Sequence, residues 1–237
     1  MSVALLQNTI IIQKYVSGYL SRKYIHNKII HNLFKDVDWI QFTKMLHDTY
    51  HMPDDNMFRF IKSEMRERVL CSLLPNCKYV GNDKYFETDI IFPNITEKHI
   101  KLEVKCVKGL FRNKKGDSSG IILKNGRGKG QTIHSLLHSI KKNVFILIDT
   151  KPPFSICYCF PNQLMFYIDK KSNAVDYKTI LNSNELLNKR TAELYGYINK
   201  KNVYFIKDML IDNNYIYDDY NPVNELMSLF IERYNDP

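Results

Sequence analysis

The chain has 237 residues, and 44% of them are hydrophobic, which is enough apolar material to bury a substantial core and argues against intrinsic disorder. The 34 Lys and Arg residues outnumber the 25 Asp and Glu residues and give a formal net charge of +9. This excess favours a polyanionic partner, with nucleic acid as the first to test, although a lysine-rich coding composition would give the same charge.

The cysteines and the N-terminal segment both argue against secretion. The five cysteines are an odd number without C-x-x-C spacing, so they predict neither a disulfide framework nor a structural zinc site. The most apolar N-terminal run, residues 9–12, is too short to span a bilayer, and no signal pattern accompanies it. A reducing, cytoplasmic location is therefore expected.

Helical spacing of apolar residues dominates the first third of the chain. From residue 4 to about residue 50 the apolar positions recur at intervals of three or four, which predicts a helical N-terminal layer, delimited here as residues 1–55. The acidic pair Asp54-Asp55 marks the start of a further helix over residues 56–74, and Pro75 ends it.

The apolar period then changes from that of a helix to that of a strand. Residues 84–92 and 98–107 alternate in polarity and predict an antiparallel β-hairpin. Apart from residues 110–111 and the apolar run 121–123, residues 108–131 are mostly Gly, Lys, Arg, Ser and Asn and predict a long polar loop. A short helix over residues 132–141 and a buried strand over residues 143–149 follow, so strand, crossover helix and strand form a βαβ unit.

Elements of both kinds continue toward the C-terminus. Strands are predicted at residues 155–160, 164–168 and 203–206, and helices near residues 183–194 and 222–234. No linker cleanly divides the chain. We therefore expect an α/β (α+β) protein with its core at residues 56–150, the polar loop inserted in that core, and a mixed region, residues 151–237, packed on it.

Three charged residues of the hairpin can form a catalytic site. Side chains alternate along a strand, so Glu103 and Lys105 share one face, and Asp89 lies in the partner run. Phosphodiester hydrolysis needs a metal that activates water and a cation beside the developing charge. We assign Asp89 and Glu103 as Mg²⁺ ligands, with the carbonyl of Val104 as a third, and Lys105 as the group that orients the water and stabilises the transition state.

A second interpretation of the same residues needs no chemistry. An E-x-K tripeptide on a strand is also typical of a solvated face that carries an exposed ion pair of little energetic consequence. What favours a site is the context: the apolar residues that follow Asp89, the helix upstream of the hairpin and the βαβ unit downstream.

The spacing of these residues is similar to a known motif. Thr88-Asp89, followed after thirteen residues by Glu103-Val104-Lys105, resembles the motif of the PD-(D/E)xK nuclease superfamily, in particular the type II restriction endonucleases. Thr88 stands where the motif has proline, a departure that the family often tolerates.

The resemblance covers roughly residues 56–150 and implies a fold, a cofactor and partners. It implies a restriction-endonuclease-like mixed β-sheet core flanked by helices. It also implies Mg²⁺ as the cofactor, with Mn²⁺ as a substitute, and double-stranded DNA as the substrate. A homodimer is expected, with a monomer left open, and a companion DNA methyltransferase in the host.

Members of this family often carry an acidic residue on the helix before the hairpin, and this chain offers two candidates. On a helical wheel, Glu64 flanks the apolar stripe of Ile61, Met65 and Val69, whereas Glu67 lies nearly opposite that stripe. Glu64 is therefore the better candidate for a catalytic role. An ordinary exposed glutamate paired with the basic residue four positions on is the alternative.

The polar loop is the predicted DNA-reading element, because it leaves the sheet three residues after Lys105. Arg and Lys suit guanine edges, Asn and Gln suit adenine edges, and glycines let the backbone approach phosphates. A flexible, solvated loop is the alternative. The candidate DNA-binding residues are Lys108, Arg112, Lys114, Lys124, Asn125, Arg127, Lys129 and Gln131.

Three functions are compatible with these residues. The first is a type II restriction endonuclease, which hydrolyses double-stranded DNA at specific sites with Mg²⁺. The second keeps the same metal site but acts in repair, on DNA junctions or on RNA, because a fold does not fix its substrate. The third is a basic DNA-binding protein without catalysis.

Overall fold

The computed structural model describes residues 27–81, 88–92, 100–112, 117–125, 130–167 and 174–210. In this part of the chain six strands form a mixed sheet, in the order β1-β2-β3-β6-β7-β12. The strands are β1 (Lys78–Tyr79), β2 (Ile90–Phe92), β3 (Ile100–Val107), β6 (Asn143–Asp149), β7 (Phe154–Cys159) and β12 (Tyr204–Leu210).

The pairing of these strands confirms two sequence predictions. β2 and β3 pair antiparallel, with Ile90 opposite Leu102, and β3 and β6 pair parallel, with Leu102 opposite Val144. β6 is buried along its whole length. The unbroken apolar run in the sequence predicted such a strand, covered on both faces. Its bounds equal those expected from the sequence.

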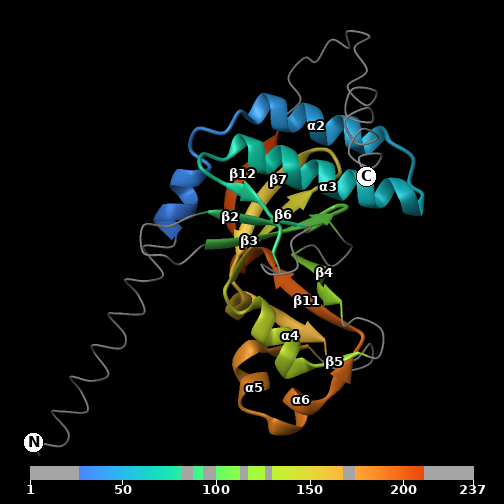
Figure 1. Ribbon diagram of the computed structural model, residues 1–237, viewed down its shortest axis with the longest axis vertical. Helices are drawn as coiled ribbons and strands as arrows, with labels where there is room; N and C mark the ends of the chain where they lie inside the picture. The colour runs from blue at the N-terminus through green and yellow to red at the C-terminus, as the bar shows by residue number, and fades with distance from the viewer. Residues whose placement is uncertain are drawn as a thin grey trace, which may run out of the picture.

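Helices cover one face of the sheet (Figure 1). Residues 27–33 are helical, and α2 (Trp39–His51) and α3 (Asn56–Leu73) lie together over the strands. The side chain of Asp38 accepts from the backbone N–H groups of residues 40 and 41 at the start of α2, and Asp55 caps α3 in the same way through residue 58. Apolar side chains of these helices bury the face of β3 that carries Leu102 and Val104.

The other face of the sheet is covered by α4 (Ile133–Ile140) and a second, smaller sheet (Figure 1). Within the described residues this sheet has the order β4-β11-β8-β9. Its strands are β4 (Ser118–Asn125), β11 (Glu193–Asn199), β8 (Met165–Tyr167) and β9 (Val175–Asp176). The remaining elements are the paired strands β5 (Gln131–Thr132) and β10 (Arg190–Thr191), the helices α5 (Tyr177–Leu181) and α6 (Asn184–Asn188), and 3₁₀ turns at Pro161–Gln163 and Lys200–Asn202.

Two sequence predictions are wrong. The polar loop expected over residues 108–131 contains β4, in which Ile121 and Leu123 are buried while Ile122 is 46% exposed. The helix expected over residues 183–194 ends at residue 188, and β11 begins at residue 193. The two errors have one cause, because β4 and β11 pair with each other across about seventy residues of chain.

The fold is therefore α+β, as expected. Strands β7 and β12 belong to the same sheet as β3 and β6, so the sheet continues across the boundary drawn at residue 150. The helix predicted at residues 222–234 lies outside the described residues. No helix in the described residues combines the length and the apolar character needed to cross a membrane.

Candidate active site

Asp89 lies at the point where the ladder between β2 and β3 ends. The ladder pairs residues 90–92 with residues 100–102, and Asp89 comes just before it. The N–H of Val104 donates to Oδ2 of Asp89 at 2.7 Å, and Oγ1 of Thr88 donates to the carbonyl of Leu102 at 2.9 Å. The side chains of these two residues thus take the place of further ladder bonds and hold the carboxylate at the strand edge.

Glu103 and Lys105 project from the same face of β3, as predicted from the alternation of side chains. Nζ of Lys105 lies 2.8 Å from Oε1 of Glu103, and their side chains are only 24% and 10% exposed. This degree of burial contradicts the alternative of a solvated surface ion pair. Nδ2 of Asn143, at the start of β6, lies 3.4 Å from the other oxygen of Glu103.

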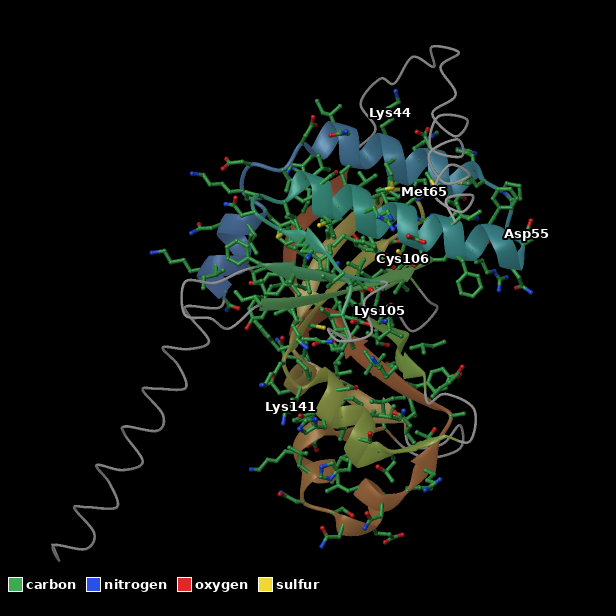
Figure 2. The ribbon with its side chains drawn as sticks, in the orientation of Figure 1. Lys44, Asp55, Met65, Lys105, Cys106 and Lys141 are labelled. Atoms are coloured by element: carbon green, nitrogen blue, oxygen red, sulfur yellow. The ribbon has the colours of Figure 1, made fainter. Side chains whose placement is uncertain are left out.

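The two faces of β3 therefore carry different groups (Figure 2). Cys106 lies on the side toward α3, and Lys105 lies farther from that helix. Leu102 and Val104 share the helix side with Cys106 and pack in the core beneath α2 and α3. The charged pair is supported instead by Phe145 and Leu147, its register partners on β6.

The charges of the site are crowded. Burial, and after it the carboxylates of Glu103 and Glu67, raise the pKa of Asp89 to about 8, against the opposing effects of Lys105 and of the Val104 N–H. Burial also raises the pKa of Glu67. For Lys105, burial favours the neutral amine, but the three carboxylates, led by Glu103, hold its pKa above the usual value. One ammonium thus interacts with three carboxylates.

The helix residue that joins the site is Glu67, and the expectation that Glu64 would do so is not met. Glu64 forms an ion pair of 2.6 Å with Arg68. Glu67 accepts from Oγ of Ser63 at 3.0 Å and from the hydroxyl of Tyr79 at 3.2 Å, and its charge acts on Asp89 and Lys105.

The helical wheel selected Glu64 instead of Glu67 because the buried side of α3 is not purely apolar. Lys62 and Arg66 are each only 7% exposed, and they lie beside Met65 and Leu70 on the covered side of the helix. A stripe drawn through apolar residues alone leaves these two cations out and so has the wrong orientation. Glu67 lies one residue after Arg66, whose burial no hydrophobicity pattern indicates, so the sequence held no signal that selects Glu67 over Glu64.

The donors at the site are of the type that a hard cation prefers. Asp89, Glu103, Glu67 and the carbonyl of Val104 offer oxygen only, the ligand type that Mg²⁺ prefers, and the N–H and C=O of Val104 point to the same strand edge. Within the described residues, Oδ1 of Asn143 beside Glu103 is buried without a hydrogen-bond partner, as suits a site that takes up a further group. No cluster of three or more His, Cys, Asp or Glu side chains close enough to hold a metal occurs in that part of the chain.

The predicted DNA-binding residues whose side chains the structure describes lie in different parts of the fold. Lys108 follows β3 and lies near Asp54, with its side chain 67% exposed. Lys124 is a partly exposed residue of β4, and Gln131 is in β5. The side chain of Asn125 and all of Lys114, Arg127 and Lys129 lie outside the described residues.

Arg112 makes its contacts inside the protein. Its guanidinium binds the carboxylate of Asp149, which is 1% exposed, and the carbonyls of residues 151, 152 and 153. Asp149 also accepts from the backbone N–H groups of Gly109 at 2.9 Å and Lys151 at 3.0 Å. Arg112 therefore joins the turn after β3 to the turn after β6, and its donors are used there and not on a base.

Comparison of the chain with protein-family models, with curated proteins and with solved structures found no match. The chemistry of the site must therefore be argued from its own residues. Two of these, Glu67 and Asn143, were not selected from the sequence. Asn143 opens an otherwise apolar strand, and a polar residue at that position is the signal that could have drawn attention to it.

The crowding around Asp89 has a consequence for stability that can be measured. A carboxyl whose pKa is raised on folding binds its proton more tightly in the folded state, so in EDTA the protein should lose stability as the pH rises from about 4 to about 8. Asp89→Asn keeps an acceptor for Val104 and removes the charge. We expect this variant to be more stable than the wild type at pH 8 by at least about 1 kcal/mol.

Urea unfolding at pH 5 and pH 8 tests this expectation. Asp36→Asn, at an exposed position, is the matched control and should leave the pH dependence unchanged. A wild-type protein that is equally stable at both pH values, or an Asn variant that is less stable at pH 8, would contradict the expectation.

Proposed function

We propose that this protein is an endonuclease that hydrolyses phosphodiester bonds in double-stranded DNA with Mg²⁺, as type II restriction endonucleases do. One observation carries the proposal: Asp89, Glu103 and Lys105 come together at a strand edge, partly buried, with more negative charge than the single ammonium balances. A partly buried excess of carboxylates is what a divalent cation compensates.

The residues that would hold the cation are Asp89 and Glu103, with the carbonyl of Val104 as a third ligand. Mg²⁺, or Mn²⁺ in its place, would polarise the phosphate and lower the pKa of the attacking water. Asn143 would keep Glu103 oriented through its amide, since its Nδ2 lies 3.4 Å from Oε2 of that residue.

Lys105 would act as a cation and not as a base. Its raised pKa keeps the ammonium protonated at neutral pH, and Glu103 fixes its position. Such a group can hold the attacking water by a hydrogen bond and stabilise the negative charge that develops on the phosphate.

The order of elements supports the restriction-endonuclease-like core. Helix α3 precedes the antiparallel β2–β3 pair, and helix α4 lies between β3 and β6, which pair parallel; β4, a strand of the second sheet, also lies between β3 and α4. A restriction role would imply a cytoplasmic enzyme with a companion DNA methyltransferase that protects host DNA. A homodimer and a monomer both remain compatible with it.

A second candidate is a nuclease of the same chemistry that recognises the shape of its substrate, such as a repair or junction enzyme or a ribonuclease. The observation that favours it is the use of Arg112 inside the protein and the presence of β4 in the segment expected to read bases. Both features reduce the length of free chain available for direct readout.

Incubation of purified protein with supercoiled plasmid DNA tests the proposal and separates the two candidates. We expect cleavage with Mg²⁺ or Mn²⁺ and none in EDTA. Discrete fragments with constant ends support a restriction enzyme, whereas nicks limited to junctions or single-stranded regions support the second candidate. No cleavage of plasmid, junction or RNA substrates with either metal would refute the proposed function.

The two helix glutamates give a sharper prediction. Glu67→Gln should lower the cleavage rate at limiting Mg²⁺ by about tenfold, because the charge of Glu67 acts on both Asp89 and Lys105. Glu64→Gln, the matched control on the same helix, should stay within twofold of the wild type. Cleavage rates are measured for both variants across a series of Mg²⁺ concentrations. An equal loss of cleavage rate in the two variants would contradict the role of Glu67.

A further inference from the structure

A cleft of about 660 Å³ lies beside the candidate active site, on the other face of β3. The end of α2, the first half of α3, and the residues at the ends of β3 and β6 form its walls. Its lining residues are Thr49, Tyr50, His51, Met52, Asp54, Arg59, Lys62, Ser63, Arg66, Cys106, Lys108 and Thr150.

The cleft is strongly cationic. Among the described residues that line it, Arg59, Lys62, Arg66 and Lys108 are basic and Asp54 is the single acid. Asp54 lies 3.4 Å from Nζ of Lys62 and 3.5 Å from Nζ of Lys108, and its side chain is 64% exposed. One exposed carboxylate is thus shared between two ammonium groups, which leaves a net positive charge facing the cavity.

Arg66 is the most informative residue in this cleft. It is 7% exposed; Nε donates to Oγ1 of Thr49 at 2.9 Å, and the guanidinium also hydrogen-bonds the thiol of Cys106. Within the described part of the chain no carboxylate lies at ion-pair distance from its guanidinium. A guanidinium has five donor hydrogens, and burial of its charge without a counter-charge is unfavourable. Arg66 is therefore arranged to receive an anion from the cavity.

Lys62 adds a second buried cation. It is also 7% exposed, and its ammonium donates to the carbonyl of Met52 at 3.1 Å. Two buried cations with neutral or weak partners are well suited to a phosphate oxyanion, which accepts charge-assisted hydrogen bonds from both. The volume exceeds what one phosphate needs and falls in the range of sites for small organic ligands, while Tyr50 and Met52 offer apolar surface.

We propose that this cleft binds a phosphate group of a polynucleotide strand, with Arg66 and Lys62 at its base and Arg59 and Lys108 at its mouth. Cys106 lines the cleft and directly follows Lys105 on β3, so the cleft and Lys105 lie on opposite faces of that strand, one residue apart. That the same strand is cut at Asp89 and Glu103 rests on the proposed function, but the phosphate site itself does not.

The test measures binding without catalysis, in EDTA. Fluorescence anisotropy gives the affinity for a labelled short DNA duplex, and calorimetry gives that for deoxyadenosine 5′-monophosphate. Arg59→Gln with Lys108→Gln alters two exposed cations and should not disturb folding. We expect this double variant to bind both probes at least tenfold more weakly, and Arg66→Gln to do the same if it folds. Lys141→Gln, at the exposed end of α4, is the control and should bind within twofold of the wild type.

Unchanged affinity for both probes in the double variant would overturn the phosphate site. Competition identifies the source of the phosphate: displacement of the nucleotide by unlabelled duplex supports a strand, and failure to displace it overturns that assignment in favour of a free nucleotide. The outcome is independent of cleavage. A protein that cuts no DNA but loses binding in these variants would refute the proposed function and leave the phosphate site standing.

Discussion

Replacement of Lys105 by alanine should reduce the rate of DNA cleavage at saturating Mg²⁺ by about 10²–10³-fold, the size of effect expected when one stabilising donor is removed from a transition state. Lys105 is an ammonium that interacts with Asp89, Glu103 and Glu67 together. Its removal takes away the cation beside the developing negative charge and leaves the three carboxylates without their balancing partner.

Single-turnover rates on a defined duplex provide the measurement, and anisotropy with Ca²⁺ in place of Mg²⁺ reports binding separately. Lys207→Ala, an exposed lysine on β12 at the far edge of the same sheet, is the matched control and should cleave at the wild-type rate. If the Lys105 variant keeps more than a tenth of the wild-type rate, Lys105 does not stabilise the transition state of cleavage. A large loss of binding in Ca²⁺ would instead assign it to substrate capture.

Replacement of Arg112 by alanine should destabilise the fold by about 3 kcal/mol and lower Tm by about 6–12 °C. The carboxylate of Asp149 is almost fully buried and would keep two backbone donors but lose its counter-charge. The carbonyls of residues 151, 152 and 153 would lose a shared donor at the same time.

Thermal unfolding checks this value, with Lys108→Ala as the control. The Lys108 ion pair is 3.5 Å long and exposed on both sides, so its loss should cost well under 1 kcal/mol. An Arg112 variant with the wild-type Tm and weakened DNA binding would contradict the structural role and restore the base-reading role expected from the sequence.

Elements with a strong local pattern were predictable. α3 follows from its acidic N-cap and the proline that ends it, and β6 follows from an apolar run of strand length. The antiparallel β2–β3 pair follows from two alternating runs in succession. In each case the residues that decide the element are neighbours in the chain.

β4 and β11 were missed because their pairing joins segments that are far apart in the chain. Leu123 of β4 packs directly over Gly196 of β11, where a Cβ would lie 2.6 Å from Cδ1 of that leucine. The glycine that weakens β11 as an isolated strand is what lets its partner pack closely. The apolar run of residues 121–123 and the alternation of residues 193–199 are each too short to show which distant segment pairs with them.

The candidate site was predictable to a similar extent. Alternation along one strand is enough to place Glu103 beside Lys105, and the structure confirms their contact. The contribution of α3 was not predictable, because Lys62 and Arg66 are buried and a hydrophobicity pattern treats them as surface. The cleft they line was missed for the same reason.

Because β2 is short, the carboxylate of Asp89 has a structural role as well as the proposed metal-binding role. Its carboxylate occupies the Val104 N–H that a longer β2 would have paired, so the residue proposed to bind metal also closes the edge of the sheet. Position 89 can therefore accept only side chains that offer an oxygen in the same place, which asparagine does and alanine does not. Asp89→Asn is consequently the most conservative variant expected to weaken the proposed metal site, since it exchanges one carboxylate oxygen for an amide group and keeps the acceptor for Val104.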